Sequence, residues 1–358
     1  MDDFLVIGGG IAGLSAGAAL SRLGRVRLWE AEDALGYHAS GRSAAMFEQS
    51  YGLPTTIALN RASRADHAEG GYLSPRGLML VGLRGEAELY ARMRAELSLP
   101  EIGADAARSR VPILGADVAM AAYDPDAHDL DTWRMLQDCA RVVRAGGDVE
   151  TGRRVTEVAR VAGGWAVRAG RAEARARVLV NAAGAWADAV AALAGVVPLG
   201  LQPMRRSMAR LAAPGGRDVS DWPMVMGAGE RWYAKPDAGA LLVSPAEEDP
   251  VAPQDAWAED LVLAEGLARY QAAVAVPVTR PVATWAGLRT FTPDRGLALG
   301  PAPDRPDFVW VAGQGGYGFQ TCWAAARLVA DRVAGRTPEL DAAVARALDP
   351  ARFHRIPA

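Results

Sequence analysis

The chain has 358 residues, of which 50% are apolar and 23% charged, and its formal net charge is −3. This length predicts a large core and two domains, and the near-neutral charge argues against nucleic acid or an anionic membrane as a partner. The cysteines, Cys139 and Cys322, form no CxxC pair, and the histidines lack metal-ligand spacing. We therefore expect a cytoplasmic protein without a metal site. We also expect no transmembrane segment, because neither long apolar stretch has the pattern of a membrane helix or a signal peptide.

Residues 1–30 predict a dinucleotide-binding βαβ unit. A strand at residues 4–7 leads into a glycine run, a helix and a second strand, which ends on Glu30. In such a unit Gly8 makes the tight turn, Gly10 lets the backbone approach a pyrophosphate, and Gly13 lets the helix pack on the strand. The helix N-terminus favours an anion, and an acid in the position of Glu30 usually binds a ribose hydroxyl. The alternatives are a glycine-rich helix start without a ligand and a solvated Glu30.

Strand and helix patterns recur along the rest of the chain. In the first half we expect helical segments around a strand at 78–82 and a helix at 132–144 capped by Asp131. Strands at 153–161, 164–169 and 176–180 follow, and then a helix at 186–193 and a hairpin of 231–235 and 240–243 that turns at 236–239. The last elements are a helix at 256–272, a strand at 308–312, a glycine loop at 313–318 and a helix to about 334.

This order of elements predicts an α/β (α+β) fold, with a Rossmann-like nucleotide-binding domain and an inserted, mainly antiparallel β-sheet substrate domain. We assign residues 1–50, 140–200 and 290–358 to the discontinuous nucleotide-binding domain. Residues 51–139 and 201–289 are assigned to the substrate-binding domain.

Aspartates between residues 124 and 131 are spaced somewhat like a calcium loop. The sixth position of such a loop, normally glycine, is Asp129, and the twelfth, normally glutamate, is Met135. We therefore interpret these acids as turn and cap residues.

Several segments resemble a known family, the FAD-dependent amino-acid oxidoreductases that include D-amino-acid oxidase and glycine oxidase. The resemblance covers nearly the whole chain, and within the family it points to the bacterial D-arginine dehydrogenases. It implies FAD as the cofactor, bound non-covalently because no cysteine lies in 289–294, where some relatives attach the flavin. The segments that carry it are 36–45 (GYHASGRSAA), 180–186 (VNAAGAW), 198–203 (PLGLQP), 233–239 (YAKPDAG), 284–289 (TWAGLR) and 314–318 (QGGYG).

The resemblance also implies how FAD is bound. Arg42 and Ser43 would lie along the pyrophosphate and flavin, and the backbone of Val155 would meet the adenine. The 313–318 loop and the helix start behind it would stabilise negative charge at the pyrimidine edge of the reduced flavin. Together with the βαβ unit, the expected FAD contacts are Gly8, Gly10, Ile11, Ala12, Gly13, Glu30, Ala31, Arg42, Ser43, Ala44, Ala45, Val155, Ala183, Gly184, Trp186, Arg289, Gly315, Gly316, Tyr317, Gly318, Gln320 and Thr321.

For the substrate, the resemblance implies an amino acid whose carboxylate is bound by Arg206 and Arg289. A buried carboxylate needs a paired cation and hydroxyl donors, although on its own either arginine would more often be a surface residue. The implied reaction is hydride transfer from Cα to flavin N5, which gives an imino acid that hydrolyses to a 2-oxo acid and ammonia. The Gly316 carbonyl would accept a hydrogen bond from the amine. The expected catalytic residues are Tyr51, Arg206, Tyr233, Arg289 and Gly316.

Arg205 and Arg206 are neighbours on an expected strand. Successive side chains of a strand point to opposite faces, so only one of these two can enter the pocket.

Two positions depart from the D-arginine dehydrogenases. Leu78 stands where they have a glutamate that holds the cationic side chain, and Met46 replaces a histidine near the flavin. A buried guanidinium without its counter-charge is costly, so we expect apolar side chains to be favoured over D-Arg and D-Lys. Glu48 leaves an alternative open: turned inward it would attract a cation or act as a base, and turned outward it would only cap or solvate a helix. The expected substrate pocket is Met46, Glu48, Leu78, Met224, Met226 and Gln320.

Other functions remain open at this point. An oxidase of glycine, sarcosine or another small secondary amine would share the fold, and a non-enzymatic FAD-binding protein would share the cofactor. A monooxygenase or reductase that uses NAD(P)H would need a second nucleotide site, and only one fingerprint exists. The sequence leaves the electron acceptor open among a quinone, a carrier and O2.

Overall fold

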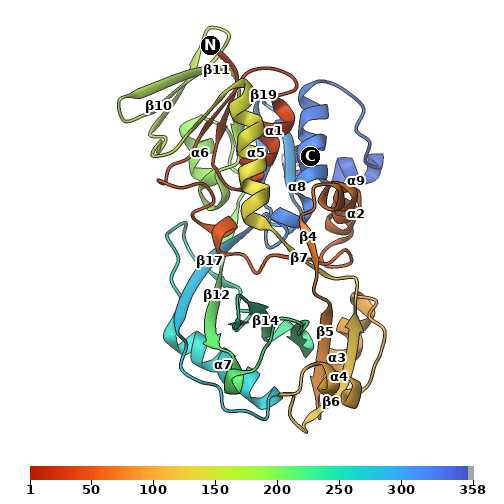
Figure 1. Cartoon of the computed structure of the whole chain (residues 1–358). Coiled ribbons are helices and arrows are strands. Elements are labelled where there is room, and N and C mark those ends of the chain that lie inside the picture. The colour runs from red at the N-terminus through yellow and green to blue at the C-terminus, as the bar shows by residue number, and fades with distance from the viewer. Residues whose placement is uncertain (354–358) are drawn as a thin grey trace.

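The computed structural model describes residues 1–353, and residues 354–358, at the end of the expected 290–358 segment, lie outside the described residues. Two lobes, each built on one large sheet, lie one above the other in Figure 1. The upper lobe carries the N-terminus and the last helices, and the lower lobe consists of middle segments of the chain. The combination of parallel and antiparallel strands confirms the expected α/β fold class.

The upper sheet has the strand order β18-β19-β11-β1-β2-β8, and the strands from β19 to β8 run parallel. A β9–β10 hairpin extends it by antiparallel pairing with β11. These strands are β1 (Asp2–Ile7), β2 (Val26–Trp29), β8 (Asp148–Glu150), β9 (Glu157–Val161), β10 (Gly164–Ala169), β11 (Ala172–Asn181), β18 (Ala298–Ala302) and β19 (Arg305–Ala312).

The alternation of side chains along β1 explains the three layers of the upper lobe. Phe4 and Val6 pack with helices α1, α5 and α8 on one face of the sheet. Leu5 and Ile7 point to the opposite face, where β10 and α6 cover them. The bounds of these helices are α1 (Ile11–Leu20), α5 (Thr132–Gly146), α6 (Ala187–Leu193) and α8 (Gly318–Val333).

Two local expectations can be compared directly with the structure. The helix capped by Asp131 is confirmed, since the Asp131 carboxylate accepts a hydrogen bond from the Arg134 N–H at 3.0 Å. The hairpin is confirmed as β14 (Tyr233–Asp237) and β15 (Ala240–Ser244), but the expected turn position is wrong because Pro236 lies inside β14. Ala238 and Gly239, with φ of 45° and 73°, make the turn. Two left-handed central residues suit a tight hairpin, because their twist matches that of the flanking strands.

The lower sheet has the strand order β16-β12-β15-β14-β13-β5-β6, and β17 also pairs with β12. Only β13 and β5 pair in parallel, as far as the described residues 1–353 show. Besides β14 and β15, the strands are β5 (Leu78–Leu83), β6 (Val118–Asp124), β12 (Gln202–Ala212), β13 (Met224–Gly227), β16 (Asp249–Pro250) and β17 (Ala283–Phe291).

The two faces of the lower sheet have different neighbours. Helices α4 (Ala104–Arg110) and α7 (Asp260–Ala273) cover one face and share an apolar cluster with Met79 and Val81. The opposite face carries a second apolar cluster, which includes Leu78 and Tyr233 and receives part of α3 (Ala87–Glu96).

Two connections join the lobes, and one helix from the expected substrate-binding part lies in the upper lobe (Figure 1). Thr290 of β17 forms a bridge with Gly315, so the lower sheet reaches the glycine loop of the upper lobe. Helix α2 (Pro54–Glu69), from the part expected to bind substrate, packs on α8, where the Ala324 N–H donates to the Ser63 hydroxyl at 3.0 Å. A small sheet lies between the lobes in Figure 1 and comprises β3 (Met46–Phe47), β7 (His128–Leu130) and β4 (Leu73–Pro75). The expected division into domains stays a prediction. Helices α2 and α5 pack on helices of the upper lobe, and α9 (Ala342–Ala347) packs against α2.

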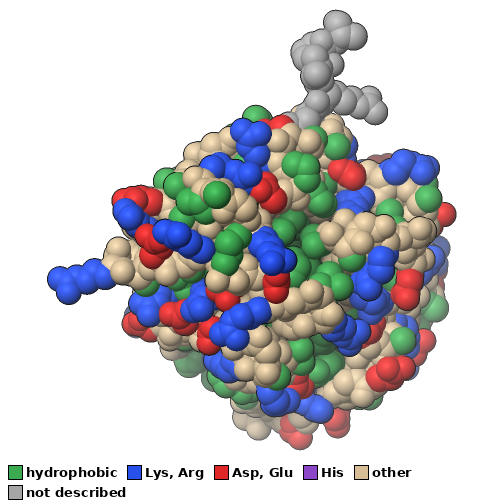
Figure 2. All heavy atoms as spheres, turned by 90° about the horizontal axis from the view of Figure 1, so that it is seen from above, with side chains coloured by type: hydrophobic (Ala, Val, Ile, Leu, Met, Phe, Trp, Pro, Cys, Tyr) green, Lys and Arg blue, Asp and Glu red, His purple; other side chains and the backbone are tan. Residues whose placement is uncertain are grey.

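The surface carries both signs of charge. Figure 2 shows basic and acidic side chains interspersed on the face seen from above. Over residues 1–353, the structure has no helix that is both long and apolar enough to cross a membrane. Within the same range, no group of three or more His, Cys, Asp and Glu residues is placed to hold a metal ion.

Candidate active site

A cleft brings together many of the expected site residues from both lobes. Its walls combine the start of α1, the end of β2, the loop after β11, the glycine loop before α8, and the lower-sheet strands β12, β14 and β17. Expected residues that line it are Gly8, Gly10, Ile11, Ala12, Glu30, Ala31, Arg42, Ser43, Ala44, Val155, Ala183, Gly184, Trp186, Arg206, Tyr233, Arg289, Gly315, Gly316 and Gly318.

The glycine turn at the start of α1 has no room for side chains. Gly8 has φ of 113°, and a Cβ there would lie 2.3 Å from the Ala182 carbonyl oxygen. A Cβ on Gly13 would lie 2.0 Å from the Gly8 carbonyl oxygen, so this glycine serves the packing of helix on strand. Gly10 caps α1, and its missing side chain leaves the helix N-terminus open to the cleft. This arrangement fits a pyrophosphate.

Glu30 is buried at the end of β2 and does not lie in solvent. Its carboxylate accepts hydrogen bonds from the backbone N–H groups of Gly9 at 2.6 Å and Glu32 at 2.9 Å. A carboxylate held in this way beside the glycine turn has the position from which an acid binds a ribose hydroxyl.

Segment 36–45, which is expected beside the flavin, is held in place by hydrogen bonds and ion pairs with distant parts of the chain. The Arg42 guanidinium donates to the carbonyl oxygens of Ala256 and Ala286 and pairs with Asp255. These bonds hold the guanidinium in the cleft wall, and its contact with FAD stays a prediction. Lys235 donates from Nζ to the Ala44 carbonyl oxygen at 2.6 Å and pairs with Asp129.

The glycine loop packs closely against the Arg289 side chain. The Gly315 N–H donates to the Thr290 carbonyl oxygen at 2.9 Å, which ties the loop to β17. A Cβ on Gly316 would lie 2.9 Å from Arg289 Cζ. Glycine at 316 therefore lets the guanidinium lie against the loop backbone.

The structure confirms that Arg205 and Arg206 point to opposite faces of β12. Arg205 pairs with Glu259 and Asp249, away from the cleft. Arg206 points to the cleft, where its guanidinium lies 6.0 Å from the ring centroid of Tyr233.

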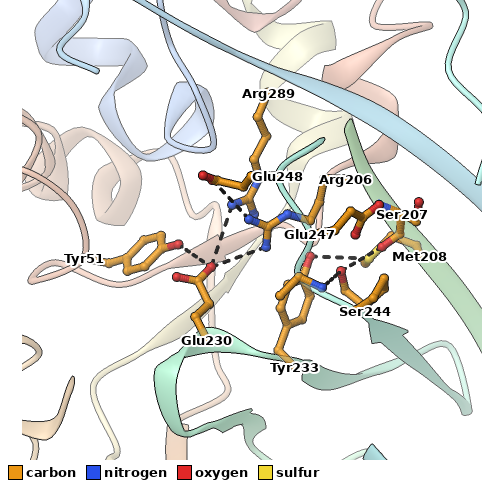
Figure 3. A network of polar contacts seen from close by, with 12 residues as sticks. Tyr51, Arg206, Ser207, Met208, Glu230, Tyr233, Ser244, Glu247, Glu248 and Arg289 are labelled. Carbon is orange, nitrogen blue, oxygen red and sulfur yellow. Dashed lines mark hydrogen bonds and ion pairs between the residues drawn. The ribbon is translucent and has the colours of Figure 1, made fainter. Parts of the chain in front are cut away.

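Arg206, Arg289 and Tyr51 converge on one acid, Glu230 (Figure 3). The Tyr51 hydroxyl donates to Glu230 Oε1 at 2.8 Å. The same oxygen lies 3.4 Å from Arg206 Nη1 and 3.9 Å from Arg289 Nη1. On its other side, Arg206 pairs with Glu248 at 3.3 Å.

Burial and charge fix the protonation states of this group. Burial by itself lowers the pKa of Arg289, but Tyr51, Tyr233 and Glu230 raise it above its usual value, so the guanidinium stays charged. Burial raises the pKa of Tyr51, and the charge of Glu230 raises it further. The Tyr51 hydroxyl therefore stays protonated and available as a donor.

Apolar side chains adjoin this polar group. Leu78, Met224 and Met226 are buried in one cluster with Tyr233, and Met46 and Tyr51 pack against it. The cluster is formed because these residues share one face of the lower sheet, with Leu78 and Met224 directly paired across β5 and β13. These apolar side chains reach the polar group through Tyr51 and Tyr233 and are not among the residues that line the cleft, so their part in a substrate pocket stays a prediction.

Glu48 is buried, which contradicts the alternative in which it turns outward into solvent. One carboxylate oxygen accepts from the Ser50 N–H at 2.8 Å, and Oε2 has no partner among the described residues. Burial raises the pKa of Glu48 to about 7, and the nearby Asp124 and Asp126 add to this effect. Near neutral pH this acid is therefore only partly ionised.

Other expected contacts lie behind the cleft wall in the structure, among residues 1–353. The Gln320 side chain accepts a hydrogen bond from the Glu48 N–H at 2.6 Å. The Thr321 hydroxyl donates to the Tyr317 carbonyl oxygen, and the Tyr317 ring lies 5.3 Å from that of Tyr51. Ala45 has φ of 56° and follows the carbonyl held by Lys235. Their contacts with the cofactor remain predictions.

Sequence reasoning missed Glu230, Glu248 and Lys235. The two acids are far from Arg206 and Arg289 in the chain, and no local motif marks them. Lys235 did have a signal, because it is the only lysine in the sequence. A single lysine in a chain rich in arginine is a reason to expect a buried, specific contact. In the structure Lys235 is buried and donates a hydrogen bond to the Ala44 carbonyl oxygen.

A model of the FAD dependent oxidoreductases (DAO) matches residues 3–332. The chain belongs to this family. It is 28% identical to the D-amino-acid oxidase of Streptomyces coelicolor, over 91% of this chain and 94% of that protein. The solved structure of glycine oxidase from Geobacillus kaustophilus has 23% identity and a TM-score of 0.81, with 98% of each chain covered, and shows the same fold.

A longer protein also matches. The chain is 30% identical to the bifunctional protein of tRNA 5-methylaminomethyl-2-thiouridine biosynthesis from Burkholderia vietnamiensis. This match covers 98% of the chain and 59% of that protein, so the chain spans about three fifths of the length of this relative.

The family assignment confirms FAD as the cofactor, and the residues present fit it. The crowded Gly8 turn, the open start of α1 and the Glu30 carboxylate would hold the pyrophosphate and ribose. The chain is thus an FAD-dependent oxidoreductase of this family.

Proposed function

We propose that this chain oxidises D-amino acids with apolar side chains to imino acids, which hydrolyse to 2-oxo acids and ammonia. The convergence of Arg206, Arg289 and the Tyr51 hydroxyl beside the apolar cluster that contains Leu78 and Tyr233 carries the proposal. FAD, held non-covalently by the Gly8 turn, the start of α1 and Glu30, would supply the redox chemistry as the acceptor of a hydride from the substrate Cα.

The protein would mainly bind and orient the substrate. Arg206 and Arg289 bind the carboxylate, since charge-assisted pairs with guanidinium are strong and directional. Tyr51 donates a further hydrogen bond, and the Gly316 carbonyl accepts one from the amine. The amine reacts in its neutral form and loses its extra proton to water, so no side chain has to act as an obligatory base. Holding Cα in one orientation lowers the entropic cost of the transfer.

The apolar cluster beside the polar group supports a preference against cationic side chains. Leu78 is buried and offers no counter-charge. Glu48, with its pKa raised to about 7, is only partly ionised at neutral pH. A guanidinium or ammonium group would thus lose its hydration without gaining a full ion pair, which is costly.

Anaerobic reduction of the flavin, followed by its absorbance, tests the proposal. We expect D-Leu, D-Met and D-Phe to reduce the flavin fast, and D-Arg, D-Lys and the L-forms to do so slowly. Fast reduction by D-Arg alone would contradict the assigned side-chain preference, and reduction by L-forms alone would contradict the stereochemistry. Peroxide formation under air would identify O2 as an acceptor, and reduction of a quinone or a carrier would identify a dehydrogenase.

A second candidate is the oxidation of glycine, sarcosine or another small secondary amine. It is favoured by the matches to a glycine oxidase, 28% identical over 72% of this chain, and to the longer relative named for a methylaminomethyl nucleoside. The same flavin assay with glycine and sarcosine distinguishes the two candidates. Reduction by sarcosine that is faster than by every D-amino acid would favour the second.

A further inference from the structure

Glu230 lies where the donors of the proposed substrate site converge. Its Oε1 accepts from the Tyr51 hydroxyl at 2.8 Å and lies within ion-pair distance of both Arg206, at 3.4 Å, and Arg289, at 3.9 Å (Figure 3). These three side chains are the ones assigned to the substrate carboxylate. The molecule therefore already presents a carboxylate of its own to the site's anion donors.

We propose that Glu230 competes with the substrate for this carboxylate position and must be displaced when a carboxylate binds. The inference rests on the proposed function in one respect, the assignment of Arg206 and Arg289 to a carboxylate. It makes Glu230 a residue that sets affinity for carboxylate ligands, and it predicts that carboxylates bind more tightly when Glu230 loses its charge.

The backbone around Glu230 supports this role. Glu230 follows Gly229 in the short turn (Ala228–Glu230) between β13 and β14, and its φ of 52° is unusual for a residue with a side chain. Such a conformation persists where the surroundings hold it, and it is often found at functional sites. Here the surrounding ion pairs hold it, since Tyr51 and both arginines contact the same oxygen.

Displacement of Glu230 would leave neither its own carboxylate nor the arginines buried without a partner. Its side chain is 27% exposed, and it sits on a turn, so the carboxylate can move into water. Arg206 would keep its contact with Glu248 at 3.3 Å, and Glu248 in turn is held by Arg295 at 2.8 Å. The arginines are therefore preserved for the incoming carboxylate.

The test compares ligand binding to the FAD-loaded wild type and to Glu230→Gln. The probes are 4-methylpentanoate, which is the D-leucine skeleton without its amine, and the matched neutral 4-methylpentanamide. Binding is measured by titration of the flavin absorbance. Glu230→Gln removes the competing charge at nearly constant size, so we expect it to bind the carboxylate at least about tenfold more tightly. The affinity for the amide should stay unchanged.

Two further variants control the experiment. Glu230→Asn is also neutral and tolerates a positive φ, so it provides the same comparison if the glutamine variant loses its flavin. Glu265→Gln removes an exposed charge from α7 and should leave both affinities unaltered.

Each outcome is decisive. Tighter carboxylate binding with unchanged amide binding supports the proposal. Equal carboxylate affinity in wild type and variant overturns it, and weaker binding in the variant would mean that Glu230 positions the donors and does not compete. If no form binds the carboxylate, the anion site itself is refuted. The flavin-reduction assay decides the proposed function separately. If D-amino acids reduce the wild-type flavin but Glu230→Gln and wild type bind the carboxylate equally well, the proposed function stands and only the competition by Glu230 is refuted.

Discussion

The two ends of the cleft are built in different ways. At the nucleotide end, the backbone of the glycine turn and the start of α1 form much of the cleft wall, and at Gly8 and Gly13 a Cβ would collide with main chain. At the substrate end, charged side chains from β12, β17 and the loops around Tyr51 and Glu230 meet across long sequence separations. A backbone site is sensitive to any added atom, whereas a side-chain site can lose a function without losing the fold.

Gly8→Ala is expected to have the largest effect. The new Cβ would lie 2.3 Å from the Ala182 carbonyl oxygen, and the residue has φ of 113°. Overpacking and backbone strain together should cost roughly 3–6 kcal/mol of folding free energy and expel FAD. The flavin-to-protein ratio after gel filtration and the unfolding temperature measure this.

The control is Gly170→Ala, where φ is 60° and nothing lies within 4 Å of the new Cβ. It should cost only about 1–2 kcal/mol and keep its full flavin content. If both variants behaved alike, the distinction between crowded and open glycines would not hold.

The neighbouring arginines of β12 provide a direct contrast between function and stability. Arg206→Gln should raise KM on the order of 100-fold, because a charge-assisted contact with the substrate is lost. Arg205→Gln should leave KM nearly unchanged and lower the unfolding free energy by about 2 kcal/mol, since it leaves Glu259 and Asp249 without their cation. Steady-state kinetics and urea unfolding of both variants measure the contrast, and a rise in KM for Arg205→Gln would contradict the assigned faces.

Glu48→Gln tests the buried acid through pH. Burial raises the pKa of Glu48 from 4.5 to about 7, so the folded state favours the protonated form. Wild type therefore has the full contribution of this group below about pH 4.5 and loses it as pH rises through 7, by up to about 3 kcal/mol. The glutamine variant should lack this loss, and its stability advantage over wild type should grow from pH 5 to pH 8.

Urea unfolding at several pH values measures this difference. Glu265→Gln, which removes an exposed acid, is the matched control. An advantage that is independent of pH would show that Glu48 is ionised throughout this range.

Ser40→Ala should have the smallest effect. The Ser40 hydroxyl accepts from the Ile11 N–H at 3.0 Å at the start of α1. Loss of this bond should cost about 1 kcal/mol and weaken FAD binding about fivefold, as measured by flavin fluorescence on dilution. Ser21→Ala, at the other end of the same helix, removes the bond to the Gly17 carbonyl oxygen and should leave FAD affinity unchanged.

The sequence by itself determined the nucleotide half of this protein. The βαβ unit, the role of Gly13, the acid at Glu30 and the cap at Asp131 each depend on residues of one stretch of the chain, whose geometry local sterics and hydrogen bonds dictate. The need for glycine at position 8 followed from the same motif, although the group that a Cβ would meet there belongs to Ala182. The opposite faces of Arg205 and Arg206 also followed from strand periodicity alone. Through its resemblance to known relatives, the sequence further indicated the family and FAD.

The tertiary structure alone decided the charge balance of the substrate half. It placed Glu230 between Tyr51 and the two arginines, turned Glu48 inward, and brought the lone Lys235 to the Ala44 carbonyl. It also moved the hairpin turn to Ala238 and Gly239. The physical reason is that burial and the pairing of charges depend on which strands and loops become neighbours, and these contacts join residues far apart in the sequence.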